Sequence, residues 1–149
     1  AASVRVSQGP LLRSALLRHC VLIFCTVNVG ARGMLKSQEV PTVLIDEAAQ
    51  IHEAGNTVVL NSKVERLILV GDPRQLPAVV SSDLAKKAQF QRSLFERLQA
   101  IGHEPSLLDV QYRMHEEILD FSNAAFYEGR VRTDASVASR SPSARFDVD

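Results

Sequence analysis

The sequence has little of what marks secreted, membrane-spanning or metal-binding proteins. It contains 2 cysteines and no tryptophan, and neither Cys20 nor Cys25 belongs to a CxxC or Cys/His ligand pattern. We therefore expect buried, reduced thiols in a cytoplasmic or nuclear protein. The longest apolar run, Cys20 to Val27 with Thr26 inside it, is far too short to cross a bilayer, and nothing resembles a signal peptide.

Net charge is also absent, because the 17 basic and 17 acidic residues cancel. Charge thus gives no indication of a nucleic-acid partner, and such a partner has to be argued from motifs. With 46% hydrophobic and 23% charged residues, the composition is that of a folded globular chain. Its 149 residues suffice for one modest domain or for parts of two.

Two apolar runs, TVLI and LILV, end in acidic or amide residues. Asp46 and Glu47 follow the first run, and Asp72 and Gln75 come soon after the second. Such runs are typical of strands buried on both faces of a parallel sheet. Because ligands bind beyond the carboxyl ends of these strands, we expect the four side chains at one sheet edge. Carboxylate oxygens there would suit a magnesium ion and the nucleotide it accompanies.

Hydrophobic spacing predicts the other elements of an α/β chain. We expect helices over residues 11–19, 47–53, 56–60, 83–100 and 114–126. Strands are expected over residues 21–26, 42–45, 66–70, 106–110 and 146–149, and an exposed loop over 133–145. The β-branched segment 56–60 would also suit a strand, but the connection between adjacent parallel strands favours a helix. The last helix should bury Met114, Ile118, Phe121 and Ala125.

Each motif also has an ordinary structural explanation. An Asp-Glu pair after a strand can be the acidic start of a helix, and GDPRQLP can be a simple turn. Arg113 can be a surface residue, although a cation is unfavourable at a helix start and its planar fork suits phosphate oxygens. However, DEAAQ followed by a second strand and GDPRQLP is a compound pattern that chance rarely supplies. The combination favours the functional interpretation.

Together, DEAAQ, LVGDPRQLP, SLFERL and LDVQYRMHEEILDFSNAAFYEGRV resemble motifs II, III and IV of superfamily 1 helicases. The nearest group includes the nonsense-mediated decay helicase and senataxin, and the likeness covers roughly residues 14–149. The resemblance implies a RecA-like P-loop NTPase fold, a parallel sheet with flanking helices, in two domains that bind ATP and single-stranded RNA or DNA. Residues 1–88 would be the C-terminal part of the first domain, with motifs II and III. Residues 89–149 would begin the second, with motif IV.

The resemblance also implies roles for residues of the two strand ends. Asp46 would hold magnesium through water, and Glu47 would activate the water that attacks ATP. Gln75 would sense the γ-phosphate with support from Asp72.

Four further residues acquire roles in the same way. Arg113 would contact the γ-phosphate from the second domain, and Tyr112 would lie near the nucleotide base. Thr26 and Gly30 would touch the nucleic-acid backbone.

A Walker A loop is missing from the sequence. Its pattern, GxxxxGK[ST], requires a glycine followed by lysine, and none of the 7 glycines has one. The family has this loop upstream of DEAAQ and motifs V and VI downstream of QYRMH. The chain, which also lacks an initiator methionine, is therefore expected to be a central fragment that is inactive by itself.

The expected function of the parent protein is ATP hydrolysis coupled to translocation or unwinding, usually 5′ to 3′ in this group. RNA-processing proteins would be further partners, and no membrane is expected. The main alternative is a truncated or degenerate, non-catalytic module that binds nucleic acid or protein partners. A different class of P-loop ATPase is a third reading, against which QYRMH argues.

Overall fold

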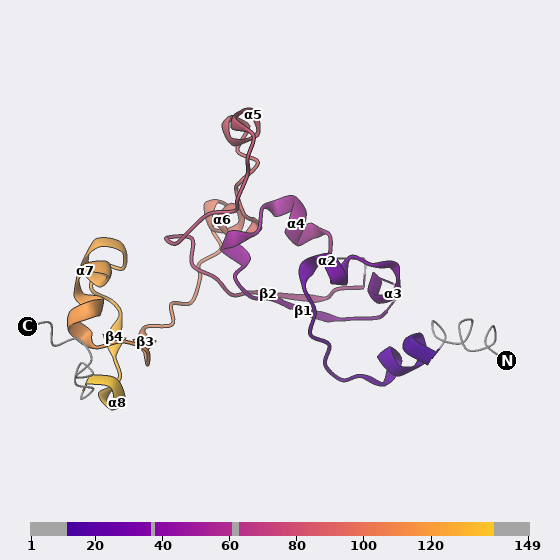
Figure 1. Cartoon of the computed structure of the whole chain (residues 1–149), viewed down its shortest axis with the longest axis horizontal. Coiled ribbons are helices and arrows are strands. Elements are labelled where there is room, and N and C mark those ends of the chain that lie inside the picture. The colour runs from indigo at the N-terminus through magenta and orange to yellow at the C-terminus, as the bar shows by residue number, and fades with distance from the viewer. Residues whose placement is uncertain (1–11, 37, 61–62, 139–149) are drawn as a thin grey trace, which may run out of the picture. The chain divides into compact units, whose positions relative to one another are not determined.

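The computed structural model describes residues 12–36, 38–60 and 63–138, and the chain divides into two compact units, Ala1–His103 and Glu104–Asp149. Residues 12–19 are helical, as expected. The first unit continues with α2 (Val27–Gly30), α3 (Gly33–Lys36), β1 (Thr42–Ile45), the 3-10 turn η1 (Ala48–Gln50), α4 (Glu53–Thr57), β2 (Arg66–Leu69), α5 (Asp83–Lys87) and α6 (Leu94–Ala100) (Figure 1). The second unit contains β3 (Val110–Gln111), α7 (Glu116–Phe126), β4 (Arg132–Thr133) and α8 (Ala135–Ala138). Within the described ranges, no helix has the length and apolarity needed to span a bilayer.

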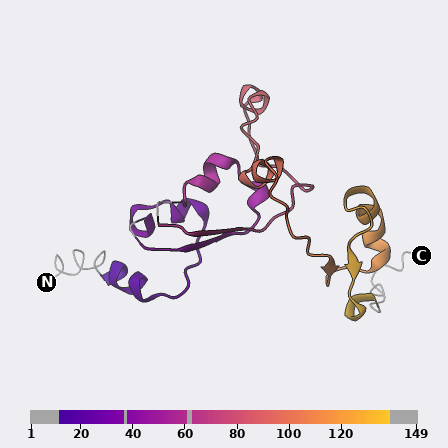
Figure 2. The same cartoon turned by 180° about the vertical axis from the view of Figure 1, so that it is seen from behind.

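The sheet of the first unit is a parallel pair, β1 with β2, whose register joins Ile45 to Leu69 at the carboxyl ends. The two strands run side by side in both views (Figures 1 and 2). Both were predicted, but burial on both faces was not found. Ile45 is buried, whereas Leu44 and its register partner Ile68 are 59% and 40% exposed. Among the described residues of the first unit, the buried apolar side chains are instead Ala48 and Ala49 of η1, Leu94 of α6, Ile45 and Ala78.

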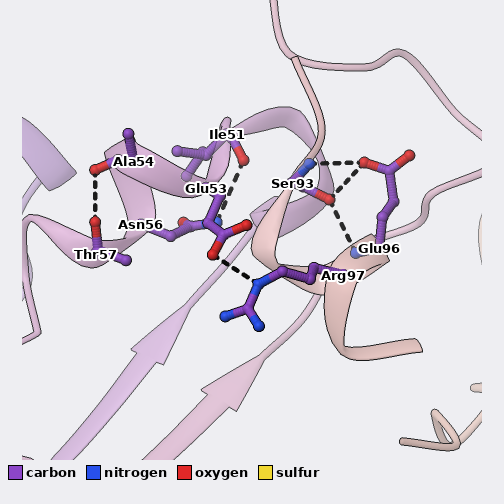
Figure 3. A network of polar contacts seen from close by, with 8 residues as sticks. All are labelled: Ile51, Glu53, Ala54, Asn56, Thr57, Ser93, Glu96 and Arg97. Atoms are coloured by element: carbon purple, nitrogen blue, oxygen red, sulfur yellow. Dashed lines mark hydrogen bonds and ion pairs between the residues drawn. The ribbon is translucent and has the colours of Figure 1, made fainter. Parts of the chain in front are cut away.

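The helix α6 packs against η1 and α4, and polar contacts join α6 to α4 and cap its start (Figure 3). Arg97 of α6 donates from Nε to Oε1 of Glu53 in α4 over 2.6 Å. The buried Ser93 caps α6: its Oγ accepts from the Glu96 amide at 3.1 Å, and the Glu96 carboxylate accepts from the Ser93 amide at 2.8 Å. This reciprocal capping box fixes where the helix begins.

The compact units divide after His103, later than the 88/89 boundary that the resemblance implies. The difference arises because α6 packs on elements of the first unit. The assignment of residues 1–88 and 89–149 to two family domains stays a prediction.

The predicted helix 83–100 is two helices. Gln89 has φ 58°, and the chain turns before Ser93 starts α6. Gly102 does end the second helix as expected: with φ 97°, it lets its own amide and that of His103 bond the carbonyls of Gln99 and Leu98. The C-cap at Ala88 and the N-cap at Ser93 thus divide the apolar pattern of residues 83–100, although its spacing is that of one helix.

The predicted strand 21–26 was wrong. Val21, Leu22 and Phe24 are 103%, 70% and 88% exposed, and no described strand pairs with this segment. Cys20 and Cys25 are consequently exposed, not buried. A β-propensity run without a neighbour to receive its backbone hydrogen bonds does not become a strand.

Smaller corrections concern the other elements. The predicted helix 47–53 is replaced by η1, and the helix expected over 56–60 is α4, which begins at Glu53. The expected strand 106–110 is the short β3, which pairs in parallel with β4. In α7, Leu119 is the buried residue, whereas Ile118 and Phe121 of the expected apolar face are 69% and 80% exposed. The expected loop 133–145 begins with β4 and α8, whose Val137 is buried; residues 139–149, including the predicted strand 146–149, lie outside the described residues.

Candidate functional site

The carboxyl ends of β1 and β2 meet, as the sequence predicts. The Val70 amide donates to the Ile45 carbonyl at 2.9 Å, and the Ala48 amide donates to the Val70 carbonyl at 2.8 Å. Gly71 lies directly against the turn that follows β1: a Cβ added there would be 2.9 Å from the Ala49 nitrogen. The segment of Asp46 and Glu47 is thereby joined, backbone to backbone, to the segment that leads into Asp72.

Glu47 occupies an unusual backbone conformation at this junction. Its φ of 52° is left-handed, which is uncommon for a residue with a side chain. Its amide donates to Oδ1 of Asp46 at 3.0 Å, and its Oε2 accepts from Nε2 of Gln50 at 3.0 Å. Both carboxylates are exposed to solvent. The local fold therefore turns the chain sharply after β1 and holds two acidic side chains at the sheet edge.

The segment after β2 forms its own compact turn. Oδ1 of Asp72 accepts from the Arg74 amide at 2.9 Å, and Oδ2 accepts from Nε2 of Gln75 at 2.9 Å. The Gln75 amide also donates to the Asp72 carbonyl at 3.2 Å. Asp72 thus orients the Gln75 side chain, and the Gln75 carboxamide oxygen has no described donor on it. This geometry fits the expected supporting relationship between the two residues.

Asp46 has the chemistry that a magnesium–nucleotide complex needs. The part of the chain that the structure describes contains no group of three or more His, Cys, Asp or Glu arranged to hold a metal ion by itself. Mg²⁺, however, usually keeps several waters and takes only one or two carboxylates plus phosphate oxygens. The exposed Asp46 carboxylate has one oxygen engaged by the Glu47 amide and the other without a described protein donor. The residues present therefore fit a water-mediated magnesium site.

Asn56 supports this edge and was missed from the sequence. It is fully buried in α4, and its Nδ2 donates to the Ala48 carbonyl at 3.4 Å and to the Ile51 carbonyl at 3.3 Å. Figure 3 shows the bond to Ile51. These two carbonyls lie at the start of η1 and just beyond its end. The one signal in the sequence was an amide at the start of the mostly apolar stretch NTVVL, because a polar side chain that becomes buried normally has a specific partner.

Tyr112 and Arg113 belong to the second unit. Both are exposed and line, with Gln111 and Met114, a hollow of about 600 Å³. The supporting pair β3–β4 is held partly by Arg132, which bonds the Asp109 carboxylate at 2.8 Å and keeps the pKa of that carboxyl below its ordinary value. Gln111 was the second residue missed: its side chain bonds the backbone on either side of Arg113's Cα.

Thr26 lies at the N-cap of α2, and Gly30 is the last residue of this helix. Thr26 precedes the helix, and its hydroxyl makes no capping hydrogen bond. It lines a hollow of about 540 Å³ together with Val27, Asn28, Ile51, His52, Ala54, Gly55 and Val58. Gly30 is explained by packing, because an added Cβ would lie 2.8 Å from Cγ1 of Val59. Within the described chain, the Val59 side chain is therefore the group that approaches the Gly30 backbone.

Comparison with known proteins places the chain in a family. One family model described as an AAA domain matches residues 6–83, and a second model with the same description matches residues 90–149. The chain belongs to the AAA domain family. For such a P-loop NTPase, the parallel β1–β2 pair with flanking helices is part of an α/β, RecA-like fold.

Relatives of this AAA domain chain carry helicase names. It is 37% identical to the probable helicase MAGATAMA 3 of Arabidopsis thaliana over 85% of its length, but spans 16% of that protein. The regulator of nonsense transcripts 1 of Dictyostelium discoideum is 36% identical over 91% of the chain, which spans 10% of it. The ATP-dependent helicase NAM7 of Saccharomyces cerevisiae is 36% identical over 83% of the chain, which spans 13% of it. The resemblance to superfamily 1 helicases of the nonsense-mediated decay type is thus confirmed.

Proposed function

We propose that the AAA domain chain is part of an ATP-dependent helicase that couples ATP hydrolysis to movement along, or unwinding of, RNA or DNA. The observation that carries the proposal is the backbone junction between the ends of β1 and β2. It brings two carboxylates and a preoriented glutamine to the edge where α/β sheets bind ligands. The helicase names of relatives that match most of the chain support the same conclusion.

Residues of the first unit have separate roles toward magnesium, the attacking water and the γ-phosphate of ATP. A magnesium ion bound with ATP would neutralise phosphate charge, and Asp46 is the residue that would hold it, through water. Glu47 accepts a proton from the attacking water, which requires an exposed carboxylate with an available oxygen. Its Oε2 accepts a hydrogen bond from Gln50, which leaves Oε1 available for that proton. Gln75, oriented by Asp72, presents its carboxamide to the γ-phosphate or to that water.

The second unit contributes a cation and an aromatic ring. Arg113 contacts the γ-phosphate and stabilises the charge that develops on it during transfer. Tyr112, which is 62% exposed beside Arg113, lies against the nucleotide base. If Gln75 and Arg113 bind ATP more tightly than ADP, hydrolysis shifts the population between two conformations. That differential contact is how chemical turnover would drive movement.

Single-stranded nucleic acid is the proposed track. The uncapped Thr26 hydroxyl, at the N-cap of α2, is available to a phosphate oxygen. Gly30 is the last residue of α2, and its amide donates to the Thr26 carbonyl at 2.9 Å, so the proposed contact at Gly30 is with the backbone surface and not with its N–H. RNA-processing proteins are the further partners that we propose, in the cytoplasm or nucleus. The regulator of nonsense transcripts 1 among the relatives supports this setting.

The test is Glu47→Gln in the full-length protein that contains this chain. We expect ATP hydrolysis to fall by about 10²–10⁴-fold, the contribution typical of a general base, while binding of labelled ATP persists. Gln retains an oxygen for the bond from Gln50, so the turn should stay folded. Glu39→Gln, the same change at an exposed ion pair with Lys63, serves as the matched control and should leave hydrolysis unchanged.

Two results would contradict the proposal. Undiminished hydrolysis in Glu47→Gln would remove Glu47 from the chemistry. Binding of single-stranded nucleic acid by a wild-type protein that never hydrolyses ATP would instead favour the non-catalytic module.

A further inference from the structure

We propose that Gln111 is a positioning residue that holds Arg113 in the conformation needed for ATP hydrolysis. The inference rests on the proposed function, because Arg113 acts on ATP only if the protein is an ATPase. Gln111 is the last residue of β3 and Arg113 follows two positions later. The Gln111 side chain is half-buried, and its carboxamide bonds other residues of the chain, so we assign it a role through Arg113.

One carboxamide satisfies four hydrogen bonds around Arg113. Oε1 of Gln111 accepts from the backbone amides of Arg113 at 2.8 Å and Met114 at 2.9 Å. Nε2 donates to the Met114 carbonyl at 2.6 Å and to the Thr133 hydroxyl at 2.8 Å. The peptide groups on both sides of the Arg113 α-carbon are therefore tied to a single side chain. This fixes the direction in which the exposed arginine leaves the backbone.

The same amide connects this segment to the neighbouring strand. Gln111 pairs with Thr133 in the β3–β4 register, and the Gln111 carbonyl accepts from the Asp134 amide at 3.0 Å. The loop is thus anchored to β4 through both the backbone and the side chain of Gln111. A short loop of a few residues is otherwise free to adopt several conformations, and ordering it in advance removes that entropy from the binding step.

Only a carboxamide of this length provides the full pattern. It has an oxygen that accepts from two amides and a nitrogen that donates to a carbonyl and a hydroxyl. Glutamate at position 111 would turn an acceptor toward the Met114 carbonyl, and methionine would provide neither donor nor acceptor. Gln111→Met therefore removes the four bonds while keeping the side chain's length.

The experiment is a double-mutant cycle on steady-state ATP hydrolysis by the full-length protein with poly(U) and magnesium. The four proteins are wild type, Gln111→Met, Arg113→Ala and the double variant. We expect Arg113→Ala to lower kcat by about 10³-fold or more, as for other arginines that stabilise phosphoryl transfer. Gln111→Met should lower kcat at least about tenfold, because small misplacements of a catalytic group are costly, with the KM for ATP changed less. On the Arg113→Ala background, Gln111→Met should cause no further loss.

A control separates positioning from general stabilisation. Asn123→Leu removes another carboxamide of the second unit, one that bonds both the amide and the carbonyl of Val131 at 3.0 and 2.8 Å. It should lower the unfolding temperature as Gln111→Met does, but leave kcat near the wild-type value. If Gln111→Met lowered kcat by the same factor in the wild-type and the Arg113→Ala backgrounds, Gln111 would only stabilise the fold, and the inference would be overturned. An unchanged kcat in Gln111→Met would overturn it as well.

Amide hydrogen exchange tests the positioning without relying on activity. The Arg113 and Met114 amides should exchange severalfold faster in Gln111→Met and not in Asn123→Leu. Unchanged protection of both amides would overturn the inference even if kcat fell. Conversely, normal hydrolysis by Arg113→Ala would contradict the proposed role of Arg113, while faster exchange in Gln111→Met would still show that Gln111 orders the segment.

Discussion

Arg97 and Glu53 form an ion pair of 2.6 Å between residues 44 positions apart in the chain. Glu53 is the first residue of α4, just beyond the turn that carries Glu47, and its amide also donates to the Arg92 carbonyl at 3.0 Å. The stretch that leads into α6 is therefore bonded to the element that supports the candidate site. An antiparallel bridge between His52 and Ser93 reinforces the same attachment.

We expect Arg97→Met to loosen α6 from α4. The pair is about one-third exposed, with 38% and 31% of the two side chains accessible, so the loss should be roughly 1 kcal/mol. For a chain of this size, that is about 2–4 °C in unfolding temperature, measurable by circular dichroism. Lys86→Met breaks a more exposed pair with Asp83 and should change the temperature little. Equal effects of the two substitutions would contradict a special role for the Arg97 pair.

Gly71→Ala should disturb the junction between the two site segments. The added Cβ would lie 2.9 Å from the Ala49 nitrogen and 3.0 Å from the Ala48 nitrogen, backbone atoms that can move only together with η1. Overpacking of this kind costs about 1–3 kcal/mol, measured as a lower midpoint in urea. Gly33→Ala is the matched control, since no atom lies within 4 Å of its added Cβ, and it should be neutral or slightly stabilising. An unaffected midpoint in Gly71→Ala would mean that the two segments are not in contact in solution.

The 149-residue chain by itself should not hydrolyse ATP, because its sequence contains no GxxxxGK[ST] loop to cradle the phosphates. A phosphate-release assay on the purified chain, with Glu47→Gln as background, provides the measurement. Turnover that disappears in Glu47→Gln would show that other residues of the chain replace the loop.

The Asp109–Arg132 pair should give stability a defined pH dependence. Hydrogen bonds from Arg132 lower the pKa of Asp109 from its ordinary value of 3.8. A carboxyl group whose pKa is lower in the folded state contributes stability above 3.8 that is lost as the pH falls through the lowered value. In Arg132→Gln, the pKa of Asp109 measured by NMR titration should rise back toward 3.8. The stability difference between the two proteins should shrink as the solution is acidified; a constant difference would exclude this linkage.

The strands and the site edge were predictable because local signals agree with the tertiary fold there. The runs TVLI and LILV became β1 and β2, and the parallel register brought Asp46 and Asp72 to one edge. The polar residues that orient the site were not predictable in the same way. Asn56 and Gln111 act through bonds to backbone groups, and no periodicity in the sequence records where those groups will lie.

The failed predictions share a physical cause, which is that burial depends on neighbours. Val21 and Phe24 have high β-propensity but no described strand beside them, so they and the nearby cysteines are exposed. In α7, Leu119 is buried while Ile118 is exposed, so the contact face is rotated from the one that the spacing of apolar residues favours. Helical period identifies a helix, whereas its packing partners decide which apolar side is covered.

The left-handed backbone of Glu47 has an evolutionary consequence. A residue with a side chain costs about 1–2 kcal/mol in this conformation, so glycine would be the more stable choice at position 47. If the Glu47 carboxylate activates water as proposed, selection for stability and selection for that carboxylate act in opposite directions at one position. A lineage that no longer used the carboxylate would be free to drift to glycine or asparagine there, and the residue at position 47 would record that loss.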